Sequence, residues 1–171
     1  MRDRRFVAVH RGGPLDKVRH RLLAAWAADC AERLVPLFEA HGSDVRPRQA
    51  VLLARAWAEG EASVGECMQA SLGAHAAARA ASDAAAIAAA RAAGHAVATA
   101  HAADHSLGTV IYGTKAIVAA GGLPDAERDW QLNHLPDTVR ELVVTALERR
   151  QAGRCQVPGA SAHRSRGVRS S

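Results

Sequence analysis

The stretch from Asp83 to Ala120 constrains the fold more than any other part of this chain. It reads DAAAIAAARAAGHAVATAHAADHSLGTVIYGTKAIVAA. Alanine has the highest helix propensity and loses no side-chain entropy on ordering. Small residues also let a second helix approach closely. We therefore expect a central, tightly packed helical segment, either one kinked helix or two, that carries the histidines His95, His101 and His105.

The composition extends this expectation to the whole chain. Forty of the 171 residues are alanine, whereas only 4% are aromatic. A chain of this length fits one domain with a real core. We predict an all-α fold, a compact bundle of about six to seven antiparallel or orthogonally packed helices with an alanine-rich core. Residues 14–151 form this domain, between a flexible N-terminal arm over 1–13 and a basic, disordered tail over 152–171.

Local signals set the expected helix boundaries. Apolar residues spaced three and four apart, together with proline, glycine and capping residues, predict where each helix begins and ends. Ser63 and Glu66 match a capping box, and the aspartates Asp44, Asp125 and Asp137 are expected to cap later helices. The predicted helices cover residues 15–34, 47–59, 64–81, 83–105, a segment that starts between 106 and 109 and ends near 121, 126–134 and 138–151.

Charge is distributed unevenly along the sequence. The formal net charge is +5, but the basic excess lies at the two ends. Residues 12–148 hold 12 basic and 16 acidic side chains, a net charge of about −4. The tail is rich in serine, glycine and arginine, a composition that buries too little apolar surface to fold. It is either a solvated tail or an arm that binds nucleic acid or other anions.

The cysteines and the apolar pattern indicate a cytoplasmic protein. Cys30, Cys67 and Cys155 are widely spaced and form no C-x-x-C pair, which favours reduced, inert thiols. The N-terminal residues have no apolar core of a secretory signal. No uncharged apolar stretch is long enough to span a membrane.

His101, Asp104 and His105 are the residues that most suggest chemistry. They form H-x-x-D-H, in which histidines four residues apart share a helix face as they do in zinc sites. A third ligand would have to come from His95, Asp44 or Glu66. One alternative is a structural role, in which the histidines pack at a close helix crossing. The other is a contact site for a binding partner. The sequence contains no pattern for catalytic or cofactor-binding residues, and neither a metal nor a cofactor is expected.

Two segments are candidates for binding a partner protein. Trp130 and Gln131 lie on a short predicted helix, where a large aromatic residue either anchors the packing or contacts a partner. The second segment contains Asp44, Arg46 and Arg48, which form either a solvated, ion-paired face or a contact surface.

Several segments together resemble one protein family. They are LLAAWAADCAERLVPLFE (22–39), DVRPRQA (44–50), ARAWAEGE (54–61), AAGHAVATAHAADHSLG (92–108) and WQLNHLPD (130–137), with Tyr112 between the last two. The combination is similar to the immunity proteins proposed for bacterial polymorphic toxin systems, the immunity-five-like group. The resemblance spans about residues 15–149 and implies an all-helical, cytoplasmic bacterial protein with no catalytic residues to carry over.

Three functions follow as hypotheses. The resemblance implies an immunity protein that binds and neutralises a cognate toxin without catalysis, and the mildly acidic body is compatible with steering toward a basic toxin. A helical scaffold or homo-oligomer with a nucleic-acid- or anion-binding tail is the second. The third is a metal-dependent enzyme that uses His95, His101, Asp104 and His105.

Overall fold

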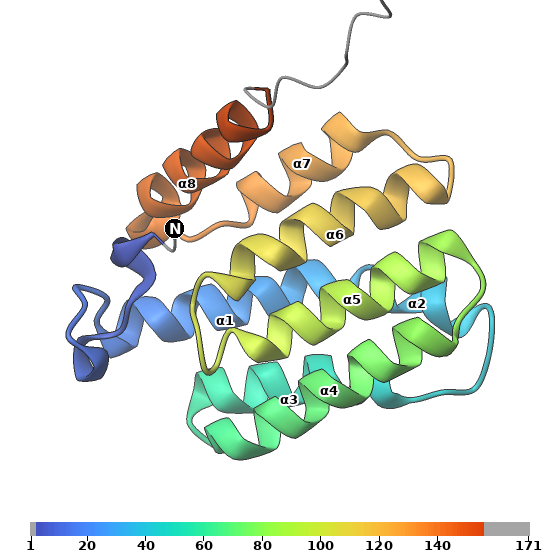
Figure 1. Cartoon of the computed structure of the whole chain (residues 1–171), viewed down its shortest axis with the longest axis horizontal. Coiled ribbons are helices and arrows are strands. Elements are labelled where there is room, and N and C mark those ends of the chain that lie inside the picture. The colour runs from blue at the N-terminus through green and yellow to red at the C-terminus, as the bar shows by residue number, and fades with distance from the viewer. Residues whose placement is uncertain (1–2, 156–171) are drawn as a thin grey trace, which may run out of the picture.

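The computed structural model describes residues 3–155, and within them the chain forms eight α-helices and no strands (Figure 1). The predicted all-α class is therefore confirmed. Two short 3-10 helices, Arg4–Phe6 and Val9–Arg11, precede the bundle. The α-helices are α1 (Lys17–Glu32), α2 (Val35–Glu39), α3 (Arg46–Glu59), α4 (Val64–Ala80), α5 (Ala84–Ala98), α6 (His105–Ala119), α7 (Pro124–Asn133) and α8 (Asp137–Cys155).

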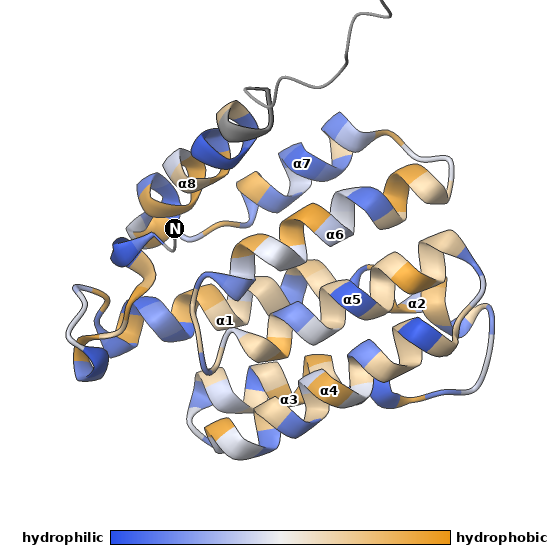
Figure 2. Cartoon of the chain, viewed as in Figure 1, coloured by the Kyte–Doolittle hydropathy of each residue, from blue (hydrophilic) through white to orange (hydrophobic). Residues whose placement is uncertain are grey.

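Helix α5 is the centre of the bundle. It lies between α4 and α6 and also packs against α1, α2 and α3 (Figure 1). Its buried residues are nine alanines, Gly94 and Val97. In Figure 2 much of α4 and α5 has the pale orange of moderately hydrophobic residues such as alanine. Because such side chains are short, neighbouring helices pack closely. The alanine-rich core that the sequence predicts is therefore present.

Larger side chains fill the space between α5 and the outer helices. Around Trp26, which is 1% exposed, residues of α1, α6 and α8 form one part of the core together with Phe6. Phe38 of α2 packs with Leu34 and with alanines of α4 and α5 in a second part. The third part joins α1, α3, α4 and α5. The large aromatic side chains Trp26, Phe6 and Phe38 thus pack in the parts of the core around α5, whereas alanine predominates on α5 itself.

Several helix ends match their sequence signals. Ser63 and Glu66 form the predicted capping box at the start of α4, and Asp83 accepts a hydrogen bond from the backbone N–H of Ala86 at 2.8 Å. Gly60 ends α3 with a φ of 93°, a left-handed conformation that glycine adopts at little cost.

The three expected aspartate caps are wrong as N-caps. Val45 is the N-cap of α3, and the Asp44 carboxylate instead accepts from the Arg46 N–H at 3.1 Å. Leu123 precedes α7, so Asp125 lies in its first turn, and Asp137 is itself the first residue of α8. At these positions a carboxylate still lies near the positive end of the helix dipole.

The helix predicted over 83–105 is shorter than expected. It ends at Ala98, and α6 begins only at His105. The Nε2 of the buried His20 lies 2.6 Å from the Thr99 carbonyl oxygen, so the imidazole N–H can donate to a carbonyl that leaves the helix. Because helix ends leave carbonyls without partners inside the helix, this bond from α1 stabilises the break. Residues 83–120 are therefore two helices.

The N-terminal segment, predicted as a flexible arm, packs against the body in this structure. Phe6 is 3% exposed, and the Arg5 guanidinium donates to the Thr145 hydroxyl of α8 at 2.8 Å. Asp3 lies 3.5 Å from Arg149. At the other end, α8 continues to Cys155, four residues past its predicted end at Gln151. The rest of the predicted basic tail, 156–171, lies outside the described residues. No helix of residues 3–155 has the length and apolar character needed to cross a bilayer.

Candidate functional site

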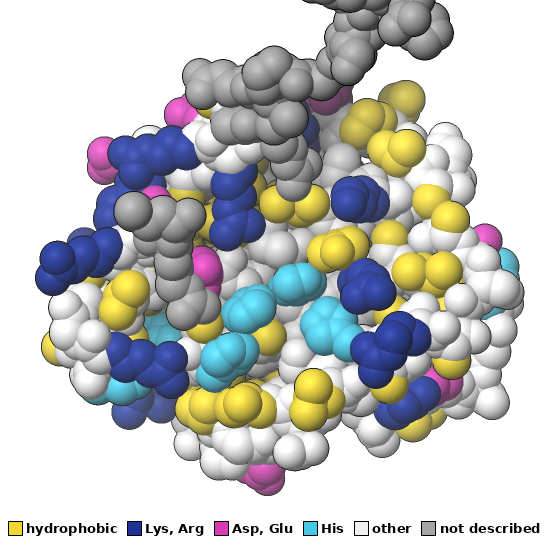
Figure 3. All heavy atoms as spheres, viewed as in Figure 1, with side chains coloured by type: hydrophobic (Ala, Val, Ile, Leu, Met, Phe, Trp, Pro, Cys, Tyr) yellow, Lys and Arg dark blue, Asp and Glu magenta, His cyan; other side chains and the backbone are white. Residues whose placement is uncertain are grey.

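Three histidines from three helices and a fourth from the α5–α6 connection form a cluster on one face of the protein. His75 of α4 lies beside His95 of α5 with 5.3 Å between ring centroids, and His95 lies 5.2 Å from His105 of α6. His101, in the connection before α6, lies 4.9 Å from His105. Figure 3 shows histidine side chains gathered over α4, α5 and α6, with lysine and arginine side chains beside them. The three histidines predicted to group therefore do so, and His75 joins them.

Glycines make room for two of these rings. A Cβ at Gly94 would lie 2.7 Å from the His75 ring, and a Cβ at Gly108 would lie 2.6 Å from the His95 ring. Distances below 3.0 Å are not found for real Cβ atoms, so any larger residue forces the ring or the helix to move. Tyr112 stacks on His95 with ring centroids 5.2 Å apart. The cluster is thus built into the helix crossings.

Two rings of the cluster, His75 and His95, have pKa values lowered below the ordinary histidine value, which favours their neutral form near pH 7. The pKa of His95 is lowered to about 4, first by burial and then by the neighbouring positive charges of His105, His75, Arg91 and Arg150. Burial also lowers the pKa of His75, with Arg91 and Arg79 as smaller causes. The Nδ1 atoms of His95 and His105 are 3.0 Å apart. One ring donates its N–H and the other accepts, which requires at least one neutral imidazole.

The geometry does not assemble the metal site that H-x-x-D-H suggested. Asp44 is bonded to Arg46 and Glu66 to Ser63, so of the three possible further ligands only His95 lies beside the pair. Within residues 3–155, no group of three or more histidine, cysteine, aspartate or glutamate residues is placed to hold a metal ion. A structural role at the helix crossing stays a prediction for these histidines.

The candidate residues on α7 have different surroundings. Gln131 is 0% exposed, and its amide donates to the Glu127 carboxylate at 2.8 Å. Its backbone carbonyl accepts from the Trp26 indole N–H at 2.9 Å. Trp130 is half-buried, with the Arg33 guanidinium 4.1 Å from its ring centroid. A partner can therefore reach Trp130, whereas Gln131 holds α7 to the core.

The candidate residues of the α2–α3 connection are ion-paired. Arg46 lies 2.5 Å from Asp44, and Arg48 lies 2.5 Å from Glu39. The Asp44 and Glu39 carboxyls have lowered pKa values because these guanidinium groups donate hydrogen bonds to them. Their opposite charges already compensate one another, so this surface offers little net charge to a partner.

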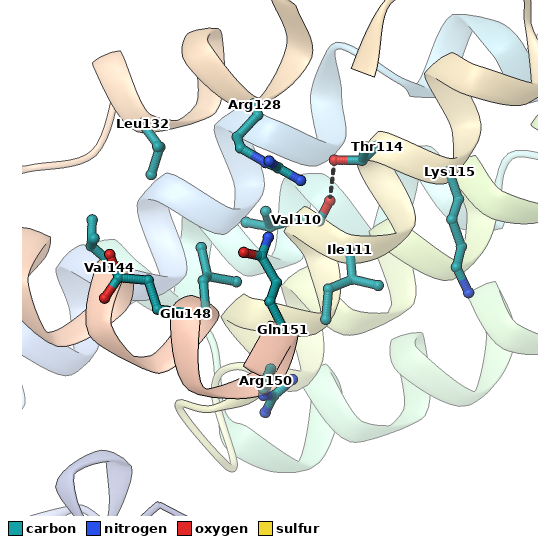
Figure 4. Close-up of a pocket in the computed structure, with 11 residues that line it drawn as sticks. Val110, Ile111, Thr114, Lys115, Arg128, Leu132, Val144, Glu148, Arg150 and Gln151 are labelled. Carbon is teal, nitrogen blue, oxygen red and sulfur yellow. Dashed lines mark hydrogen bonds between the residues drawn. The ribbon is translucent and has the colours of Figure 1, made fainter. Parts of the chain in front are cut away.

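The sequence gives no sign of a cleft that α6, α7 and α8 enclose. Its volume is about 370 Å³. Figure 4 shows Arg128 reaching from α7 toward Thr114, and Gln151 reaching from the end of α8. Because the lining comes from three separate helices, no spacing in the sequence could reveal it. The lining residues are Val110, Ile111, Thr114, Lys115, Arg128, Leu132, Val144, Leu147, Glu148, Arg150 and Gln151.

A second hollow, of about 600 Å³, lies where the N-terminal segment meets α1, α3 and the α5–α6 connection. His20 and Trp57 line it, with ring centroids 4.8 Å apart. The pKa of His20 is lowered by burial, which keeps the ring neutral while it bonds to Thr99. The two rings that line this hollow already have contacts within the protein, His20 with the Thr99 carbonyl and Trp57 with His20.

The thiols of Cys30 and Cys67 are poor nucleophiles. Cys30 is fully buried, and burial strongly raises its pKa. Burial also raises the pKa of Cys67 to about 11. A thiol reacts through its thiolate, so both side chains act as small apolar residues near neutral pH.

Comparison with known proteins identifies a family. The model of the family described as "Imm-5 like putative immunity protein" matches residues 13–138. This range extends from before α1 to the start of α8 and contains the histidine cluster and α7. A search of curated proteins and a search of solved structures found no match. Because the matched range is well over half of the sequence, the chain belongs to the Imm-5-like family of putative immunity proteins.

Proposed function

We propose that this protein binds a cognate toxin of a bacterial polymorphic toxin system in the cytoplasm and neutralises it without catalysing a reaction. The observation that carries the proposal is the family match over residues 13–138. An immunity protein of this kind acts by occupying a surface of the toxin, and a fixed surface on its own fold favours tight binding.

The structure supports a preformed binding surface. The crossings of α4, α5 and α6 are fixed by buried alanines and by glycines that contact histidine rings. The short outer helix α7 is fixed by the buried Glu127 and Gln131. A surface that does not reorganise on binding loses less conformational entropy, which favours tight association.

The test is co-expression with candidate toxin domains encoded by the genes that neighbour the gene of this chain. We expect the chain to restore growth of cells that produce the toxin, and the two purified proteins to form a complex. A toxin inactivated in its active site controls for expression. Toxicity that persists at full expression of this chain, with no complex between the purified proteins, would contradict the proposal.

A titration then separates binding from catalysis. Increasing amounts of the chain are added to a fixed amount of active toxin, and residual toxin activity is measured. If the chain neutralises by binding, toxin activity reaches zero at a fixed stoichiometric ratio of the two proteins. Activity should return when the complex is dissociated in denaturant and the separated toxin is refolded. Loss of all activity at a small fraction of one equivalent, without recovery, would instead indicate an enzyme.

A further inference from the structure

The cleft enclosed by α6, α7 and α8 has an apolar floor that is open to solvent. Val110, Ile111, Leu132 and Leu147 contribute to its lining, and its volume is about 370 Å³. A space of this size accommodates one or two large apolar side chains. An apolar hollow bordered by charged residues is typical of a surface that accepts an anchoring side chain from a partner.

Most of the charged residues around this floor are basic, and these basic side chains form no ion pair with an acidic residue of the described part of the chain. Lys115, Arg128 and Arg150 line the cleft, whereas Glu148 is the one acidic residue of the described lining. Among the ion pairs of residues 3–155, none includes Lys115, Arg128 or Arg150.

Several arginines elsewhere on the bundle are ion-paired, whereas others, such as Arg79 and Arg91, take part in no ion pair within residues 3–155. Arg55 binds both Asp29 and Glu32, at 2.6 and 2.5 Å. Arg48 binds Glu39 at 2.5 Å. At the cleft, three basic side chains without an ion-pair partner among the described residues border the apolar floor together with a single acidic one, although residues 12–148 as a whole carry a net charge of about −4. A partner with negative charge gains most at this position.

We infer that the cleft between α6, α7 and α8 binds an acidic segment of the partner protein, which places an apolar side chain on the floor and carboxylates against Arg128 and Arg150. The inference rests on the proposed function and names the contact face and the chemistry of the toxin surface. The chain's own residues 156–171 do not fit this chemistry, because they contain Arg164, Arg166 and Arg169 and no acidic residue.

Charge reversal at the rim tests the inference. The double variant Arg128→Glu/Arg150→Glu changes two exposed side chains, and Ile111→Trp fills the cleft from α6. The control Lys17→Glu/Arg79→Glu makes the same charge change at exposed positions on α1 and α4. Affinity for the toxin that the co-expression test identifies, inactivated in its active site, is measured by calorimetry at low and high salt.

We expect the rim variant to weaken binding at least tenfold at low salt and to reduce the salt dependence, because reversed charges repel the acidic segment. We expect Ile111→Trp to weaken binding at least tenfold at both salt concentrations, and the control to remain within threefold of wild type. Circular dichroism confirms that each variant is folded.

The outcomes separate the two proposals. If wild type binds the toxin and both cleft variants bind equally well, the cleft inference is overturned and the proposed function stands. If the control loses affinity as much as the rim variant does, only overall charge matters and the inference also fails. If wild type neither binds nor neutralises the toxin, the proposed function fails and the inference fails with it.

Discussion

The contact between Gly108 and His95 shows how one missing methyl group positions a ring. An alanine inside a helix is ordinarily more stable than glycine by about 0.5–1 kcal/mol. At residue 108 the added Cβ would lie 2.6 Å from the His95 ring. A clash of this kind in a packed interior costs about 1–3 kcal/mol, so the clash exceeds the gain in helix propensity.

We therefore expect Gly108→Ala to lower the free energy of unfolding by about 1–2 kcal/mol in urea denaturation. The matched control is Gly73→Ala in α4, whose Cβ would make an ordinary contact of 3.6 Å with Arg46. It should raise stability by about 0.5–1 kcal/mol. Equal stability gains in the two variants would show that the His95 ring yields without cost.

The lowered pKa of His95 predicts how stability depends on pH. The unfolded chain binds a proton at this residue near the ordinary histidine pKa of 6.5, whereas the folded protein binds it only near 4. Stabilisation from the neutral ring is therefore complete above pH 6.5 and is lost as the pH falls toward 4. After allowance for partial exposure, we expect His95 to account for a loss of about 1–2 kcal/mol.

The measurement compares wild type with His95→Gln by urea denaturation at several pH values between 7 and 4.5. The variant should lose less stability over this range, while the lowered pKa values of His75 and His20 maintain part of the slope. An exposed histidine, His134, replaced by glutamine serves as the control. Stability that increases on acidification would contradict the assignment.

Helix α7 is fixed from inside by polar contacts, which a sequence pattern does not show. The Glu127 side chain is 1% exposed and lies 3.3 Å from the Arg33 guanidinium, and it also accepts from the Gln131 amide. Polar residues on a short helix ordinarily face water, so the sequence predicts an accessible Gln131. The Gln131 amide lies close to the backbone of α6, since a Cβ at Gly113 would approach its nitrogen to 2.8 Å.

We expect Gln131→Ala to destabilise the protein by about 2–4 kcal/mol, because it leaves a cavity and removes a hydrogen bond to a buried carboxylate. Asn133→Ala, an exposed change on the same helix, should stay within about 0.5 kcal/mol of wild type. Thermal melts measure both. A folded Gln131→Ala protein of wild-type stability that has lost toxin binding would instead make Gln131 a contact residue.

Across the bundle, the sequence predicted what local chemistry determines. Helix class, the capping box at Ser63, the turn at Gly60 and the alanine core each depend on neighbours in the sequence, and each is present. The break at Thr99 was not predictable, because the stabilising donor is His20, 79 residues earlier. The same reason applies to the cleft, whose walls are brought together by tertiary packing.

The distribution of charge likewise becomes clear only in three dimensions. The net charge of the body suggested an acidic protein that attracts a basic toxin. Many of its acidic groups are already paired with arginines, as at Arg55 and Arg48, whereas the basic rim of the cleft is available. Local pairing, rather than net charge, therefore determines which partner charge the surface attracts.

The contacts of Gly94 with His75 and of Gly108 with His95 predict which substitutions occur together during evolution of the family. A larger residue at either glycine requires a smaller facing ring or a wider helix crossing, and a wider crossing opens the alanine core around α5 at a cost in stability. In relatives of this chain, substitutions at 94 and 75, and at 108 and 95, should therefore occur together. We expect a relative that changes only one member of a pair to have the two helices farther apart at that crossing.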